Sequence, residues 1–130
     1  MNNVPGGADL LAIARETLVT ELRPLLSEHA RYELAMIANA MAIAAREAAA
    51  GEAPERAALG RLDALYGAPE RELHGAALRD AVRAHERWLA VDIRAGRYDA
   101  NDEKRRALVE HLRETVRAKL RISNPKSLEP

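Results

Sequence analysis

The sequence has 130 residues with 20 acidic and 20 basic side chains, so its formal net charge is zero. This length suits a single domain, and a balanced charge gives no reason to expect nucleic acid or an anionic membrane as a partner. Because there is no cysteine, disulfides, thiolate catalysis and zinc–sulfur sites are excluded.

The apolar residues make up 48% of the chain but include no Phe, one Trp and three Tyr. Most are Ala (27 residues) and Leu (17 residues). Ala and Leu favour helices, whereas the β-branched and aromatic residues typical of strands are scarce. The composition therefore predicts an all-α protein.

The first predicted helix covers residues 9–23. Asp9 follows two glycines and can complement the positive end of the helix. Leu11, Leu18 and Leu22 recur at helical spacing, and Pro24 is expected to end or kink the helix.

The second predicted helix covers residues 28–50, between Ser27 as the N-cap and Gly51 as the left-handed C-terminal residue. From Leu34 to Ala45 it contains one polar side chain, Asn39. A helix that is apolar on all sides must be covered on most of them. We therefore expect it to be central, surrounded by other helices of the chain or on one side by a second copy.

Three more helices are predicted, at residues 54–66, 69–95 and from Asp99 or Asn101 to 121. Pro54 and Pro69 suit first turns, while glycines follow the first two of these helices. The chain is thus expected to be one domain, 1–130, with loose termini at 1–7 and 123–130. Its predicted architecture is an antiparallel bundle of four long helices and one short helix. Since an Ala-rich core buries little area per residue, a homodimer is also expected.

Asn39, His85 and Trp88 are the candidate ligand-binding residues. A buried Asn39 amide needs hydrogen-bond partners, from a ligand, from a neighbouring helix or as a register device. His85 and Trp88 are three residues apart, so they share a helix face that could line a groove for a small apolar or planar ligand. The alternative is a rim histidine beside a core tryptophan.

Catalytic and metal-binding patterns are missing from the sequence. No HExxH motif or pair of His residues at i, i+4 occurs. We expect no Asp or Glu within the apolar stripes, which argues against a di-iron bundle. No catalytic residue, metal or cofactor is therefore predicted, although His85 or His111 acting as a base remains a third possibility.

The last predicted helix is basic, with seven Lys or Arg between Lys104 and Arg121 against Glu110 and Glu114. It could meet an acidic partner surface or a phosphorylated cofactor, or be a solvated face. The sequence begins without a signal-peptide pattern, and no apolar stretch approaches the roughly 20 residues of a membrane span. A cytoplasmic protein is the expectation.

Three segments carry a resemblance to a known family: "YELAMIANAMAIAAREAAAG", "LAVDIRAGRYD" and "HLRETVRAKLRISNPKSL". In order and spacing the chain resembles the bacterial family called domain of unknown function 6285. The resemblance implies a small helical protein, often encoded beside acyl-CoA dehydrogenases and aminoglycoside-phosphotransferase-like kinases. It carries over no catalytic role. The positions that match its motifs are Asn39, Arg94, Gly96, Lys119, Asn124 and Pro125.

Together these features favour a non-catalytic helical accessory protein that forms a homodimer. The resemblance suggests that it binds a partner enzyme of acyl-CoA or related small-molecule metabolism, such as an acyl-CoA dehydrogenase or a kinase-like enzyme. The alternative is a small-ligand-binding bundle with a pocket near Asn39, His85 and Trp88.

Overall fold

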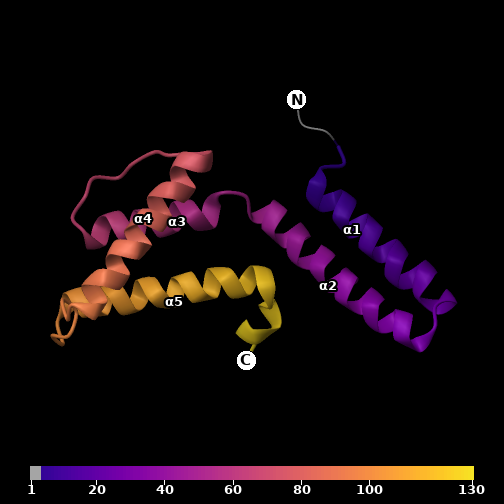
Figure 1. Ribbon diagram of the computed structural model, residues 1–130. Helices are drawn as coiled ribbons and strands as arrows, with labels where there is room; N and C mark the ends of the chain where they lie inside the picture. The colour runs from indigo at the N-terminus through magenta and orange to yellow at the C-terminus, as the bar shows by residue number, and fades with distance from the viewer. Residues whose placement is uncertain (1–3) are drawn as a thin grey trace. The chain divides into compact units, whose positions relative to one another are not determined.

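The computed structural model describes residues 4–130, and within this range every regular element is helical. The elements are α1 (Gly7–Thr17), a π-helical turn (Leu18–Leu22), a 3-10 turn (Arg23–Leu25), α2 (Glu28–Ala50), α3 (Ala53–Leu65), α4 (Gly75–Arg94), α5 (Glu103–Ser123) and a 3-10 turn (Pro125–Leu128) (Figure 1). The predicted all-α class is thus confirmed.

The chain divides into two compact units. The first comprises the residues up to Gly51 together with Arg121–Pro130, and the second comprises Glu52–Leu120. Each unit has its own packing and is described separately below.

The first unit is built on a hairpin in which α1 lies alongside α2 (Figure 1). Arg15 on α1 donates a hydrogen bond from Nε to the carbonyl oxygen of Ala38 on α2 (3.1 Å). Near the other end of α2, Arg46 donates from Nε to the carbonyl oxygen of Ile122 (2.6 Å). Both bonds join segments that are far apart in the sequence.

The first predicted helix ends as an α-helix at Thr17, earlier than expected, although the chain stays helical beyond that point. The next turn is π-helical, with the N–H of Arg23 donating to the carbonyl oxygen of Leu18. Pro24 then lies inside a 3-10 turn that ends at Leu25. The change of helix type before Pro24 agrees with the inability of proline to continue an α-helix.

Helix α2 has the predicted bounds, 28–50. The hydroxyl of Ser27 accepts a hydrogen bond from the N–H of Ala30 (3.3 Å), and Gly51 ends the helix with a positive φ of 57°. Of its apolar segment, only Leu34 and Ala38 are buried, whereas Met36 and Ile37 are 56% and 53% exposed. The first unit by itself therefore does not enclose α2, and the central position of this helix remains a prediction.

The core of the second unit joins α3, α4 and the start of α5. Its buried residues are Leu59, Leu62, Leu78, Val82, Leu89, Tyr98 and Leu108. On α3 and α4 these leucines and Val82 recur at spacings of three, four and seven, which places them on one face of each helix. The buried face of α4 extends as far as Leu89, whereas Ile93 is exposed.

Helix α4 starts at Gly75, and the predicted start at Pro69 is wrong. Gly75 has a φ of +56°, a conformation that an L-amino acid adopts rarely, and His74 before it is extended. The segment between α3 and α4 also carries Arg71, which reaches back to α3. Contacts with α3 therefore take the place of the extra helical turn.

Helix α5 starts at Glu103, where the carboxylate of Asp102 accepts a hydrogen bond from the N–H of Arg105 (3.0 Å). The cap is thus Asp102 and not Asp99 or Asn101. Leu108, Leu112 and Val116 form an apolar stripe along α5, of which Leu108 is buried whereas Leu112 and Val116 are exposed.

Candidate functional site

His85 and Trp88 are brought together on α4, as their spacing predicts. Their ring centroids are 6.3 Å apart and the rings are tilted by 32°, so they do not stack. Tyr66 approaches the His85 ring edge-on, with centroids 5.7 Å apart. Trp88 is 66% exposed, so it is a surface residue, and the alternative of a core tryptophan is wrong.

His85 contacts α3 through Asp63. Its Nδ1 lies 3.0 Å from the carbonyl oxygen of Ala81, and because a carbonyl only accepts, this nitrogen carries the proton. Its Nε2 lies 3.7 Å from Oδ1 of Asp63. The protein therefore holds the ring through Nδ1, while Nε2 faces the buried carboxylate.

Asp63 corrects the expectation that no acidic side chain lies in an apolar stripe. It is 1% exposed and lies on the packed face of α3, four residues after Leu59 and next to Leu62. Arg71 donates two hydrogen bonds to it, from Nη2 (2.7 Å) and from Nε (3.3 Å). These bonds raise the pKa of the guanidinium, and they compensate for burying the carboxylate.

A second polar cluster joins the end of α3 to the end of α4. The hydroxyl of Tyr66 donates to Oδ2 of Asp92 (2.9 Å), and Nε of Arg97 lies 3.4 Å from Oδ1 of the same carboxylate. Burial, together with the bond to Asp92, raises the pKa of Tyr66. The carboxylate of Asp92 thus binds Tyr66 and Arg97, and its contacts do not include His85.

The hydroxyl of Tyr98 differs from the other buried polar groups. It is buried, yet it makes no hydrogen bond within residues 4–130. Burial and the charge of Asp92 raise the pKa of this hydroxyl, whereas the neighbouring Tyr66 hydroxyl acts to lower it. The ring itself belongs to the core, and Nζ of Lys104 lies 4.9 Å from its centroid.

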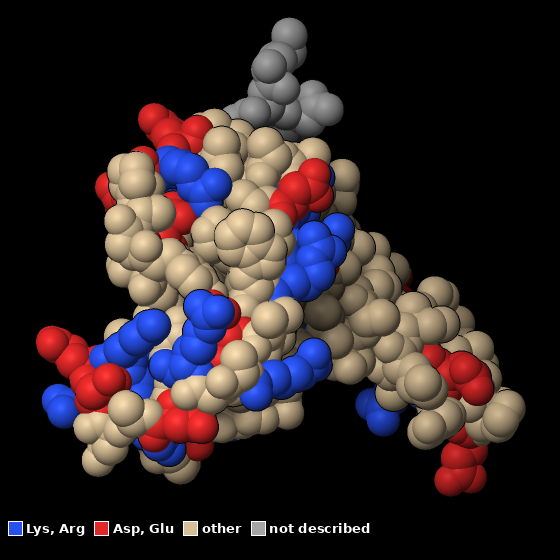
Figure 2. Space-filling model, turned by 60° about the vertical axis from the view of Figure 1, so that its left-hand side comes forward, with Lys and Arg blue, Asp and Glu red and all other residues tan. Residues whose placement is uncertain are grey.

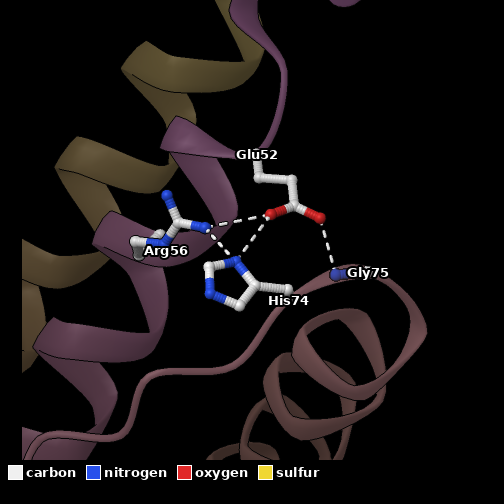
Figure 3. A network of polar contacts seen from close by, with 4 residues as sticks. All are labelled: Glu52, Arg56, His74 and Gly75. Atoms are coloured by element: carbon white, nitrogen blue, oxygen red, sulfur yellow. Dashed lines mark hydrogen bonds and ion pairs between the residues drawn. The ribbon is translucent and has the colours of Figure 1, made fainter. Parts of the chain in front are cut away.

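The start of α4 is capped by a residue from before α3 (Figure 3). One carboxylate oxygen of Glu52 accepts a hydrogen bond from the N–H of Gly75 (2.6 Å), and the other lies 2.9 Å from Nη2 of Arg56 and 3.4 Å from Nδ1 of His74. The bond from Gly75 is the main reason why the pKa of Glu52 is lowered. This network fixes where the second unit begins its α4 helix.

His111, the other candidate base, is buried in α5. Nε of Arg61 donates to its Nδ1 (3.3 Å), so the neutral ring carries its proton on Nε2. Burial and the nearby charge of Arg61 lower the pKa of His111. The ring is therefore held as a neutral core group.

Asn39 lies in the first unit, exposed on α2, whereas His85 and Trp88 belong to the second unit. Its side chain makes no hydrogen bond to another residue within 4–130. It borders a groove of about 230 Å³ between α1, the π-helical turn and α2. The groove is lined by Arg15, Val19, Arg23, Arg31, Leu34, Ala35, Ala38 and Asn39. The sequence pattern indicated Asn39 but not the arginines beside it.

The remaining motif positions lie near the ends of helices. Arg94 is the last residue of α4, and Gly96, two residues later, has a φ of +79°. Lys119 lies near the end of α5, and Asn124 and Pro125 follow that helix. On α5, Arg117 pairs with Glu114 (2.7 Å). Figure 2 shows Lys and Arg interspersed with Asp and Glu on one face, so that face offers no continuous basic surface.

Residues 4–130 contain neither a metal-binding cluster nor a membrane-spanning helix. No group of three or more His, Asp or Glu side chains there could hold a metal ion. Nor does that range contain a helix with the length and apolar character needed to cross a membrane.

Comparison with known families identifies the chain. The model described as Domain of unknown function (DUF6285) matches residues 24–127. The chain belongs to this family. The resemblance drawn from the three sequence segments is thus confirmed, and the matched range of DUF6285 contains Asn39, His85, Trp88 and His111. Neither the curated proteins nor the solved structures gave a match.

Proposed function

We propose that this DUF6285 protein is a non-catalytic helical assembly protein, which forms a homodimer and binds an enzyme of acyl-CoA or related small-molecule metabolism. The observation that carries the proposal is the incomplete core of the first unit. Its α1–α2 hairpin buries only Leu34 and Ala38 as apolar residues. Two packed helices with so small a core do not account for a stable fold, and association supplies the missing burial.

A second copy is the occupant that best suits the uncovered side of α2. Tyr32, Met36 and Ala40 are exposed and recur every four residues, on the side of the helix opposite Leu34 and Ala38. Two such hairpins facing each other would make a four-helix bundle. In that dimer, α2 would take the central position that its sequence predicts, within an antiparallel arrangement.

The second unit supports a further protein contact. Trp88 and Val91 are exposed on α4, and Val109, Leu112 and Val116 are exposed on α5 at spacings of three and four. Exposed aromatic and aliphatic side chains of this kind are typical anchors of interfaces. The genes that neighbour this family, as the resemblance implies, are the reason for naming an acyl-CoA dehydrogenase or a kinase-like enzyme as the partner.

A non-catalytic role is supported by the partners of the buried ionisable groups. Asp63 is bonded to Arg71 and His111 to Arg61, so each is engaged by the fold. A catalytic acid or base must instead reach a substrate. Their present contacts fit the stabilisation of the second unit.

Sedimentation of the wild type and of two variants tests the dimer. We expect a mass of twice the 14.3 kDa chain at micromolar concentration. Met36→Asp should reduce it to one chain, because the dimer would bury an unpaired carboxylate. Val109→Asp, the same type of change on α5 of the second unit, is the control and should remain dimeric. A wild type that sediments as one chain would refute the dimer.

Co-purification tests the enzyme partner. The protein is expected to retain an acyl-CoA dehydrogenase or kinase-like enzyme encoded beside it. Trp88→Ala is expected to lose this enzyme while Met36→Asp keeps it, because the two positions lie in different units. Failure of every neighbouring enzyme to bind would remove this part of the proposal and leave the dimer standing.

A further inference from the structure

The groove beside Asn39 concentrates positive charge. Three of its eight lining residues are Arg15, Arg23 and Arg31, and no acidic side chain lines it. Within residues 4–130 none of the three forms an ion pair. Arginine stays charged at any physiological pH, so the groove holds three unneutralised guanidinium groups.

Two of these arginines are held in place by the backbone. Nε of Arg15 donates to the carbonyl oxygen of Ala38 (3.1 Å), and Nε of Arg31 donates to that of Arg23 (3.2 Å). Each bond uses the inner nitrogen of the guanidinium and leaves both Nη groups for another acceptor. Side chains held in this way lose less entropy when a ligand binds.

The backbone of the groove is also unusual. Its wall includes Val19, which lies in the π-helical turn 18–22 between α1 and the 3-10 turn. Single π-helical turns occur frequently at functional sites. Here the turn lies between Arg15 and Arg23, two of the three arginines that line the groove.

We infer that this groove binds the phosphate groups of a phosphate-bearing small molecule. Guanidinium groups match phosphate oxygens with paired hydrogen bonds, and three of them can neutralise a multiply charged group, whereas a carboxylate carries one charge. The volume of about 230 Å³ is below the roughly 300–1,000 Å³ of pockets that enclose whole ligands. The groove therefore suits a phosphate or pyrophosphate group, with the rest of the ligand outside. This inference goes beyond the proposed assembly role and does not rest on it.

Titration calorimetry with inorganic pyrophosphate, orthophosphate and acetate tests the site at low salt. Pyrophosphate should bind more tightly than orthophosphate, and acetate should not bind. Arg23→Gln should weaken pyrophosphate binding about tenfold or more. This variant is the cleanest one, because the Arg23 side chain makes no hydrogen bond within the described chain and its carbonyl still holds Arg31.

Arg83→Gln is the matched control, since it removes the same charge from an exposed position of α4 and should leave binding unchanged. Asn39→Asp adds a negative charge at the edge of the groove and should abolish binding without a change of side-chain size. Circular dichroism shows whether each variant is folded. No pyrophosphate binding by the wild type, or equal weakening by Arg23→Gln and Arg83→Gln, would overturn the inference.

Discussion

The carboxylate of Asp63 accepts two hydrogen bonds from Arg71, eight residues later in the chain. Asp63 is fully inside the second unit, whereas the Arg71 side chain is 38% exposed. Removing the arginine would leave a buried carboxylate whose Oδ1 lies 3.7 Å from Nε2 of His85. The Arg71–Asp63 contact thus holds the segment between α3 and α4 against α3, and its loss should lower the stability of the protein.

We predict that Arg71→Ala lowers the free energy of unfolding by about 1–3 kcal/mol, below the loss for a fully buried pair because Arg71 is partly solvated. Urea unfolding followed by circular dichroism measures this change. Arg117→Ala, which breaks the exposed pair with Glu114, should cost less than about 1 kcal/mol. Equal losses in the two variants would contradict the role given to Asp63.

The two tyrosines of the second unit should respond in opposite ways to loss of the hydroxyl. Tyr66→Phe removes the donor to Asp92 and should cost about 1 kcal/mol. Tyr98→Phe removes a buried hydroxyl without a partner, so stability should be unchanged or higher. Thermal unfolding of the two variants checks this, and a larger loss for Tyr98→Phe would show that its hydroxyl is bonded after all.

His111 should make stability depend on pH near neutrality. Its folded pKa is lowered from the ordinary 6.5, so the unfolded chain takes up a proton more readily. Stability is therefore full above about pH 6.5 and falls as the pH drops through the folded pKa. His111→Asn keeps an acceptor for Arg61 but does not titrate. Between about pH 7.5 and pH 5.5, the variant should lose less stability than the wild type, as measured by urea unfolding; an identical pH dependence would argue against a buried neutral His111.

Glu52 should also make the stability fall as the pH decreases, although its side chain is an acid and that of His111 is a base. Its pKa is lowered from 4.5, mainly by the bond from Gly75. The contribution is present above pH 4.5 and lost as the pH falls through the folded pKa. Glu52→Gln should therefore melt below the wild type at neutral pH, and the difference should shrink near pH 3. A difference that is constant across this range would mean that the charge is irrelevant to the cap.

Sequence reasoning succeeded where the signal is local. The bounds of α2 follow from Ser27, whose hydroxyl caps the helix, and from Gly51, which ends it with a positive φ. Both signals lie within one residue of the helix. The all-α class likewise follows from residue propensities that act at each position.

The start of α4 could not be predicted in this way, because it depends on contacts across the sequence. Pro69 is a valid first-turn residue, but Arg71 is used by Asp63, and Gly75 is bonded to Glu52, 23 residues away. Asp63 itself could have been found. It lies four residues after Leu59 and three before Tyr66, which places all three on one face of the helix.

Of the polar residues that line the groove of the first unit, the sequence indicated Asn39 but not the arginines. Asn39 was conspicuous as the one polar residue of an apolar segment. Arg15 and Arg23 are on the other arm of the hairpin, and nothing in the linear order indicates that they would approach α2. Likewise, the stripe of α5 reads as core, since periodicity reports an apolar face but not what covers it.

The bond between Glu52 and Gly75 determines where the second unit can be cut out of the chain. A truncated protein that began at Ala53 would still contain all of α3, α4 and the buried core residues, yet α4 would lose the acceptor for its first amide. Such a fragment would be expected to fray at that end, whereas one starting a single residue earlier would retain the contact. The shortest fragment that keeps the start of α4 intact must therefore include Glu52, which lies just before α3.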